Sequence, residues 1–244
     1  MEEKIIERME TLQLKGMRKA FEEQCAITAS SKIKFEDRIM FLLDREILYK
    51  EERKMKNRLN RGKLRENACI EELHFSSARH IDKGQILSLA TCNWVKHHHN
   101  LIITGQTGVG KTYLGCALAD KACRDGHTIL YSRTTRLLEK LFIARSDNSY
   151  QRELDKISKI EILLLDDFGL EKLNETQRHD LLELIEDRYD LRSTIIITQL
   201  PINNWHEVIG DKTIGDAILD RLVHNAHKIK LSGPSIRERK KPIE

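Results

Sequence analysis

Apolar residues in the first third of the chain recur at helical spacing. Ile5, Met9, Leu12 and Met17 follow one another at three- to five-residue intervals up to Phe21, which predicts an amphipathic helix. A second segment carries apolar side chains on one face of a predicted helix. This helix continues into a basic stretch, and a glycine is predicted to end it. These residues are Phe35, Ile39, Leu42, Leu43 and Ile47, with Gly62 at the end.

From about residue 96 onward, short apolar runs alternate with amphipathic segments. Asn174 and Gln177 form a capping-box pattern that predicts the start of one helix. Four runs have the length and bounding residues of buried strands: 100–105, 128–132, 162–165 and 193–198. Apolar residues at helical spacing predict further helices at 112–126, 134–145 and 216–222.

Strands that alternate with helices indicate a parallel sheet, whose ligands bind at the carboxyl ends of the strands. We therefore predict an α/β fold with a parallel sheet flanked by helices over residues 96–244. Residues 1–65 are predicted to form a small all-helical domain, which binds a partner or DNA. Residues 66–95 are predicted to connect the two domains.

The composition favours a folded protein with an ionic surface and two basic clusters. Of the 244 residues, 40% are hydrophobic and 33% are charged, so a core is possible beneath a charged surface. The net charge of +4 is unevenly distributed: residues 50–65 hold eight Lys/Arg against two Glu, and residues 228–244 hold six against two. Such clusters suit an anionic partner, above all nucleic acid, although a solvated helix face or tail is the alternative.

Cysteine usage and the N-terminal residues indicate a cytoplasmic protein. The five cysteines include no C-x-x-C pair, which is typical of free thiols in a reducing compartment and argues against zinc. The histidines at 97–99 fit a polar loop before a strand better than a metal site. The N-terminus is charged and no apolar run approaches ~18 residues, so we expect a soluble protein without a signal peptide or membrane span.

The sequence GQTGVGKT matches the complete P-loop pattern G-x-x-x-x-G-K-[ST] between a predicted strand and a predicted helix. Its glycines let backbone N–H groups wrap phosphates at the positive end of the following helix. Lys111 is placed to neutralise the β- and γ-phosphates, and the Thr112 hydroxyl to ligate Mg²⁺. We therefore predict an ATP site formed by Gly105, Gln106, Thr107, Gly108, Val109, Gly110, Lys111 and Thr112.

The stretch ILLLDDFGL at 162–170 has two interpretations. Residues 167–169 spell the magnesium-binding D-F-G of protein kinases, whereas an apolar strand ending in Asp166 is typical of P-loop ATPases. A kinase needs H-R-D ahead of D-F-G, and this sequence has only a scrambled R-H-D after it, at 178–180. We therefore predict that the strand delivers Asp166 beside Thr112 as the Walker B carboxylate, a magnesium ligand.

Asp167 is then the second Walker B acid, placed to orient or deprotonate the attacking water. Glutamate is the commoner residue at this position, and aspartate is one methylene shorter. Slow or partner-stimulated hydrolysis is the resulting hypothesis.

Two polar residues, Thr198 and Gln199, end the next predicted strand. A side chain beside Walker B can contact the γ-phosphate or the attacking water, the sensor 1 role, so both are candidate catalytic residues. An ordinary transition from strand to loop is the alternative.

Arginines outside the P-loop are candidates for contacts with the phosphates. Arg221 near a helix end could reach the nucleotide of a neighbouring subunit as an arginine finger, or form a surface ion pair with Asp216 or Asp220. Arg188 is a weaker candidate for the same role. Arg237 in the tail could act as sensor 2.

The predicted helix 134–145 is amphipathic and basic, with Arg133, Arg136, Lys140 and Arg145 along it. Facing a central channel, such a helix could follow a nucleic-acid backbone through phosphate contacts without reading bases. A solvated amphipathic helix is the alternative.

Together these segments resemble a known family. Walker A GQTGVGKTYL, Walker B ILLLDDFG, then TIIITQLPINNW and GDAILDRLVHNAHKIKLSGPSIR, in this order and spacing, resemble the IstB family. IstB proteins are the ATP-binding helpers of bacterial insertion-sequence transposition and are related to the helicase loader DnaC in the AAA+ superfamily. The N-terminal LQLKGM at 12–17 and the segment 35–59 are also similar to that family, so the resemblance covers nearly the whole chain.

The resemblance implies an AAA+ ATPase core that lacks most of the usual helical lid and follows a small helical domain. Family members assemble on duplex DNA with ATP and recruit and stimulate their transposase. Carried over, residues 105–112 bind ATP, Asp166 and Asp167 serve Mg²⁺ and hydrolysis, Arg221 acts in trans, and helix 134–145 lines the DNA path. The Thr-Gln at 198–199 departs from the Ser-Gln or Asn of many relatives. The resemblance therefore does not decide which of the two residues is sensor 1.

The expected function is that of an ATP-hydrolysing homo-oligomer that binds double-stranded DNA and recruits a cognate transposase, with ATP and Mg²⁺ as cofactors. A DnaC-like helicase loader is the near alternative. A small-molecule kinase on a P-loop fold and a scaffold that binds ATP without turning it over are more distant alternatives.

Overall fold

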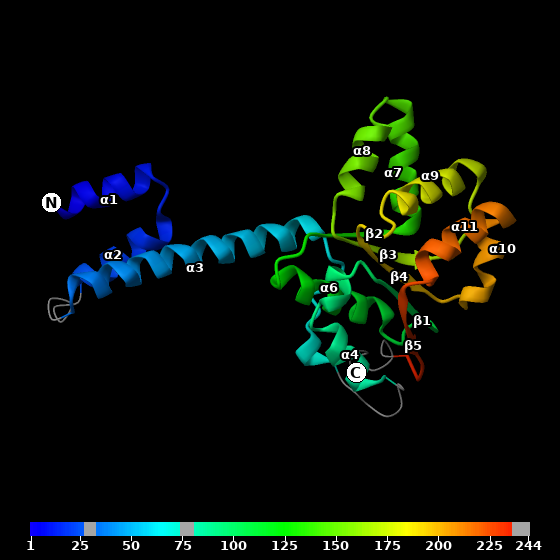
Figure 1. Ribbon diagram of the computed structural model, residues 1–244, viewed down its shortest axis with the longest axis horizontal. Coiled ribbons are helices and arrows are strands. Elements are labelled where there is room, and N and C mark those ends of the chain that lie inside the picture. Colours follow the sequence, from blue (N-terminus) through cyan, green and yellow to red (C-terminus); the bar gives the residue numbers. More distant parts are fainter. Residues whose placement is uncertain (27–32, 74–80, 236–244) are drawn as a thin grey trace, which may run out of the picture. The chain divides into compact units, whose positions relative to one another are not determined.

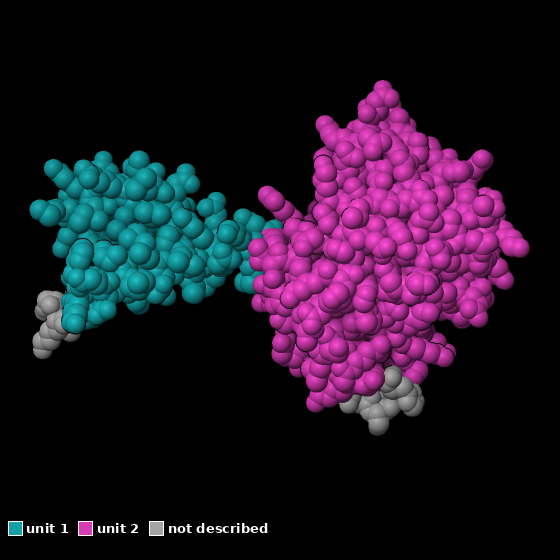
Figure 2. All heavy atoms as spheres, viewed as in Figure 1, with its two compact units in different colours: residues 1–57 teal, residues 58–244 magenta. Residues whose placement is uncertain are grey.

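A computed structural model describes residues 1–26, 33–73 and 81–235 of the chain. The chain divides into two compact units, residues 1–57 and residues 58–244 (Figure 2). None of the helices in the described ranges combines the length and the apolar run that a bilayer crossing needs.

The first unit is helical. Gly16 lies where an added Cβ would be only 2.6 Å from Tyr49 Cβ, so its missing side chain lets two helices approach closely. The buried Glu46 accepts a hydrogen bond from the backbone N–H of Met17 at 2.9 Å and so fixes the start of one helix against the other. The helices are α1 (Glu2–Thr11), α2 (Lys15–Ala26) and α3 (Phe35–Gly62), which continues into the second unit.

The first predicted helix is two helices, because the chain turns at Gln13, whose φ is +56°. Gly62 ends α3 as predicted. The predicted apolar face of α3 is only partly buried: Leu42 is 4% exposed, whereas Phe35 and Ile47 are 71% and 60% exposed. Helical spacing correctly predicted the helices but not which side chains they bury.

The second unit is built on a five-stranded parallel sheet of strand order β2-β3-β4-β1-β5 (Figure 1). The three central strands are almost completely buried, which matches their continuous runs of Ile and Leu. The strands are β1 (Asn100–Gly105), β2 (Ile129–Arg133), β3 (Ile162–Phe168), β4 (Ser193–Thr198) and β5 (Ala226–Leu231).

Alternate residues of each strand face two separate cores. Leu101 and Ile103 pack on the side of α6 (Lys111–Arg124) and α4 (Lys83–Leu89), whereas Ile102 packs on the opposite side. The helices of that opposite side are α7 (Thr134–Ser146), α8 (Tyr150–Ser158), α9 (Glu175–Glu186), α10 (Trp205–Ile209) and α11 (Lys212–Val223) (Figure 1). Short segments complete the fold: η2 (Ile70–Glu72), α5 (Asn93–Lys96) and η4 (Ile202–Asn204).

The predicted α/β fold is confirmed, with each of the four predicted strands present. The capping box is present too: Asn174 accepts from the backbone of Gln177, and Gln177 accepts in return. The patterning did not predict β5 or α8, because β5 carries few apolar residues at a sheet edge and α8 is short.

The domain limits differ from the predicted ones. The boundary between the compact units lies at residues 57 and 58, inside α3, and not at residue 65. Residues 66–95 are not a separate connector, since their described apolar side chains belong to the same core as β1. The buried ones are Ala68, Ile70, Leu73, Ile86, Leu89, Cys92, Trp94 and Val95. The pattern of apolar and polar residues in this segment did not predict that these side chains are buried.

Candidate nucleotide-binding site

The P-loop joins the carboxyl end of β1 to the start of α6. Gly105 has φ +154°, and a Cβ there would stand 2.4 Å from the Leu231 carbonyl oxygen, so only glycine fits this turn beside β5. Gly110 caps α6 in the left-handed conformation. Lys111 is buried, and its Nζ donates to the Gln106 carbonyl oxygen at 2.8 Å. The loop therefore has the backbone of a phosphate cradle with a lysine folded over it.

Asp166 lies at the end of β3 directly beside the P-loop. Its side chain is 1% exposed, and its Oδ2 accepts from the Thr112 hydroxyl at 3.0 Å. The structure thus brings together the two residues that the sequence analysis proposed as magnesium ligands. A hydroxyl and a carboxylate oxygen are the hard donors that Mg²⁺ prefers, and next to a phosphate cradle they fit such an ion.

Two further residues, which no motif in the sequence indicated, contact the same carboxylate oxygen. The Tyr131 hydroxyl donates to Asp166 Oδ2 at 2.9 Å, and Arg65 Nη1 lies 3.8 Å from it. Burial, followed by the charge of Asp166, raises the pKa of Tyr131 to about 12. Tyr131 could have been suggested by its place near the carboxyl end of a strand, but nothing in the sequence around Arg65 pointed to this site.

Asp167 sits in an unusual backbone conformation. Its φ is +57°, and the pairing of β3 with β4 shifts register between Leu165 and Phe168. The Asp167 N–H donates to Asp166 Oδ1 at 2.9 Å, and its own Oδ2 lies 3.4 Å from Arg133 Nε. Non-glycine residues with such a φ are found often at functional sites, and this one departs from the regular strand directly after Asp166.

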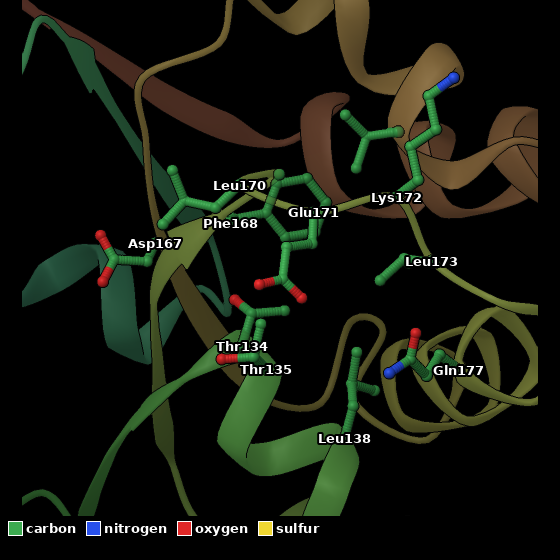
Figure 3. A pocket seen from close by; sticks show the side chains of 12 residues that line it. Thr134, Thr135, Leu138, Asp167, Phe168, Leu170, Glu171, Lys172, Leu173 and Gln177 are labelled. Carbon is green, nitrogen blue, oxygen red and sulfur yellow. The ribbon is translucent and has the colours of Figure 1, made fainter.

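A cavity of about 20 Å³ lies between the start of α7 and the loop that follows β3, which is room for one water molecule. The Glu171 side chain points toward Thr134 in this region, whereas the Asp167 carboxylate points away (Figure 3). The carboxylate proposed for catalysis therefore faces away from this cavity.

The two sensor candidates have different environments. Thr198 is 1% exposed, and its hydroxyl donates to the Phe168 carbonyl oxygen at 2.7 Å, which ties β4 to the end of β3. Gln199 is exposed, and its Oε1 accepts from the Thr107 hydroxyl of the P-loop at 2.7 Å. Gln199 is thus the candidate that contacts the phosphate cradle.

Arg188 has a structural environment, which corrects the hypothesis that it acts in trans. It is 1% exposed, and burial lowers the pKa of its guanidinium to about 9, so it stays charged at neutral pH. Its Nε lies 3.3 Å from the Thr194 hydroxyl. The remaining guanidinium nitrogens donate to the carbonyl oxygens of Ile157, Ser158, Ile160, Glu161 and Ser193.

Arg221 lies far from the P-loop of its own chain. Asn100, the first residue of β1, donates to the Arg221 carbonyl oxygen at 3.1 Å, whereas the P-loop begins at the last residue of β1, roughly 16 Å away along the strand. The Arg221 guanidinium pairs with Glu186 at 2.7 Å, not with Asp216 or Asp220. Arg237 lies outside the described residues.

Three of the four basic residues proposed to contact DNA form ion pairs within the chain. Arg133 pairs with Asp167, Lys140 Nζ lies 2.5 Å from Glu153 Oε2, and Arg145 pairs with the fully buried Asp180. Arg145 also stacks on the Tyr150 ring at 3.8 Å, so it packs α7 against its neighbours. Arg136 is exposed and makes no ion pair within the described part of the chain. Fewer basic side chains on and beside α7 are therefore available for DNA phosphates than the sequence predicted.

A P-loop on β1, an acidic pair at the end of β3 and the strand order of the sheet define a P-loop ATPase of the AAA+ class. Solved structures of this class resemble the chain. The crystal structure of DnaI covers 68% of this chain and 92% of its own with a TM-score of 0.59 at 21% identity. The DnaC helicase loader covers 68% and 97% with a TM-score of 0.56 at 21% identity.

Residues 7–243 match the family described as IstB-like ATP binding protein. The insertion sequence ATP-binding protein y4pL of Sinorhizobium fredii is 47% identical over 232 residues, which cover 95% of each chain. The insertion sequence IS1162 ATP-binding protein of Pseudomonas fluorescens is 44% identical over 197 residues, covering 80% of this chain and 85% of that one. The chain therefore belongs to the IstB-like ATP-binding protein family, which confirms the resemblance and the prediction of an ATPase.

Proposed function

We propose that this chain is an ATP-dependent transposition helper that assembles on double-stranded DNA, hydrolyses ATP and recruits its cognate transposase. The observation that carries the proposal is the contact of Thr112 with Asp166 beside a complete P-loop, in a chain whose relatives are insertion sequence ATP-binding proteins. The positive φ of Asp167 and the contact of Gln199 with Thr107 support the roles in hydrolysis proposed for these two residues.

In this proposal each residue of the site has a separate role in ATP hydrolysis. The P-loop backbone and Lys111 bind the phosphates, while Thr112 and Asp166 hold the magnesium ion, which supplies charge neutralisation on the transferring phosphoryl group. Asp167 accepts a proton from the attacking water once Arg133 releases its carboxylate. Gln199, held by Thr107, orients that water or the γ-phosphate.

Arg221 is proposed to complete the site of a neighbouring subunit. We expect Arg221→Ala to lower hydrolysis by about 1,000-fold or more without lowering ATP affinity, because the arginine neutralises charge that develops in the transition state. Glu186→Gln is the matched control: it breaks the same ion pair but leaves the arginine in place, so its hydrolysis rate should stay near that of the wild type.

A mixing experiment separates action in trans from a structural role. A mixture of Arg221→Ala with Lys111→Ala subunits creates interfaces that combine one intact P-loop with one intact arginine. Hydrolysis by the mixture should exceed the sum of the two separate variants. Equal loss in Arg221→Ala and Glu186→Gln, with no gain on mixing, would instead assign the arginine to packing of α9 against α11.

Duplex DNA binding is the experiment that tests the proposed function. In a salt titration by fluorescence anisotropy, wild-type protein should bind duplex DNA more tightly with ATP than without nucleotide. The affinity should fall as salt rises, because phosphate contacts release counterions. Arg136→Glu should weaken binding, whereas the exposed Arg152→Glu on α8 serves as a control of equal charge change. A DNA affinity that depends on neither ATP nor the salt concentration would contradict the proposal.

The partner distinguishes the proposal from its near alternative. A pull-down with purified transposase and purified replicative helicase, each with ATP and DNA, should retain the transposase. Retention of the helicase alone would favour the function of a helicase loader, the role by which the structurally similar DnaC is known.

A further inference from the structure

Arg65 brings a positive charge to the proposed magnesium site of its own chain. It stands three residues after the end of α3, and its guanidinium Nη1 lies 3.8 Å from Asp166 Oδ2. Its side chain is 36% exposed, whereas the carboxylate is 1% exposed. Neither the P-loop pattern nor the acidic pair accounts for an arginine at this position.

The segment that carries Arg65 is attached to the sheet domain on both sides. Arg58 Nε donates to the Cys123 carbonyl oxygen at 3.2 Å, and Gly62 approaches Ile129 of β2. Beyond it, Ala68 and Ile70 are buried in the core under β1. These contacts on both sides hold the segment that carries Arg65 next to the site.

The contact satisfies an electrostatic need of the buried carboxylate. A carboxylate removed from water requires a countercharge or several hydrogen bonds. Thr112 and Tyr131 donate to Asp166 Oδ2, but both are neutral, and Arg65 supplies a positive charge at the same oxygen. The Arg65 guanidinium also interacts with the Tyr131 hydroxyl, and arginine is cationic at any pH of interest.

We infer that Arg65 is a resident countercharge of Asp166 that competes with Mg²⁺ for the carboxylate and is displaced when the magnesium–nucleotide complex binds. The inference rests on the proposed assignment of Thr112 and Asp166 as the magnesium site. A guanidinium 3.8 Å from Asp166 Oδ2 would repel a magnesium ion bound to the same oxygen. Arg65 therefore sets the magnesium concentration at which the site fills and keeps Asp166 paired while it is empty.

The test is nucleotide binding as a function of magnesium. Binding of a fluorescent ATP analogue to the full-length chain is measured in EDTA and across a Mg²⁺ titration, in wild type and Arg65→Ala. The magnesium concentration for half-maximal binding should fall about two- to fivefold in the variant, since a partly exposed ion pair shifts an equilibrium by no more than about fivefold. Affinity in EDTA should not fall.

Two further variants make the outcome specific. Arg61→Ala removes the same charge from the exposed last turn of α3, so it reports any general loss of attraction for an anionic nucleotide and should leave the magnesium midpoint unchanged. Tyr131→Phe removes the hydroxyl shared by Arg65 and Asp166 and should shift the midpoint in the same direction by a smaller factor.

Several results would overturn the inference. If Arg65→Ala weakens binding equally with EDTA and with Mg²⁺, the arginine binds phosphate and does not compete with the metal. If the magnesium midpoint does not move, the contact with Asp166 has no effect on metal binding. A wild-type protein with no magnesium-dependent nucleotide binding would refute the proposed function itself, which distinguishes that failure from failure of the role of Arg65.

Discussion

Replacing Lys111 by alanine is expected to abolish ATP hydrolysis. The lysine is buried against the P-loop with its Nζ on the Gln106 carbonyl oxygen, where a phosphate would meet a preorganised positive charge. Loss of a charged hydrogen bond should weaken ATP binding about 100-fold. Loss of charge stabilisation in the transition state should slow the reaction about 100-fold again. Together these predict a fall of about 10⁴-fold in kcat/KM, measured by phosphate release.

Two variants show whether that loss is specific. Lys121→Ala removes the same charge near the other end of α6, where Lys121 pairs with Asp125 at 2.7 Å, and should keep normal kinetics. Asp167→Asn should instead keep ATP affinity while single-turnover hydrolysis falls about 100- to 1,000-fold, because only proton transfer is lost. Equal rates in wild type and Asp167→Asn would remove Asp167 from the mechanism, and a Lys111→Ala variant that still binds and hydrolyses ATP would refute the nucleotide site.

Replacing Arg188 by methionine is expected to destabilise the fold severely. Its guanidinium satisfies backbone carbonyl oxygens between the end of α8 and the start of β4 without any exposure to water. Methionine fills the space of the aliphatic stem but donates no hydrogen bond to those buried oxygens, and each lost bond costs about 1–3 kcal/mol. We expect the free energy of unfolding to fall by about 3–5 kcal/mol, measured by urea denaturation, with a lower Tm.

The control for this prediction is Arg152→Met. Arg152 is exposed on α8, so the same chemical change there should alter stability by less than about 0.5 kcal/mol. The structural interpretation also requires that Arg188→Met keep its ATP affinity at temperatures where it remains folded. A stable Arg188→Met protein that folds normally but no longer hydrolyses ATP would restore the catalytic role that burial argues against.

The local sequence predicted those features that depend on residues close together in the chain. Runs of Ile and Leu predicted β1 and β4, because a strand buried on both faces needs apolar residues at nearly every position. The P-loop was readable because the turn into α6 and the approach to phosphate depend on glycines at fixed spacing. The capping box at Asn174 was readable for the same reason, since both its hydrogen bonds join residues three apart.

Pairs of residues distant in sequence were predictable only through the topology. The contact of Thr112 with Asp166 spans 54 residues, and the sequence suggested it only because parallel strands present their carboxyl ends at one edge. The same argument placed Gln199 near the P-loop but left Thr198 as an equal candidate. Only the side-chain directions separate them, since Thr198 points into the sheet and Gln199 contacts Thr107.

The sequence by itself determined the α/β architecture, the phosphate cradle and the acidic pair, because these depend on short-range periodicity and on motifs with fixed spacing. Only the tertiary structure decided which charges are available. It buried Arg188 among carbonyl oxygens, paired Arg145 with Asp180, and brought Arg65 to Asp166. The sequence alone does not distinguish an arginine that pairs with a carboxylate from one that donates to buried carbonyl oxygens or binds a phosphate. The neighbours that distinguish these roles come from other elements of the fold.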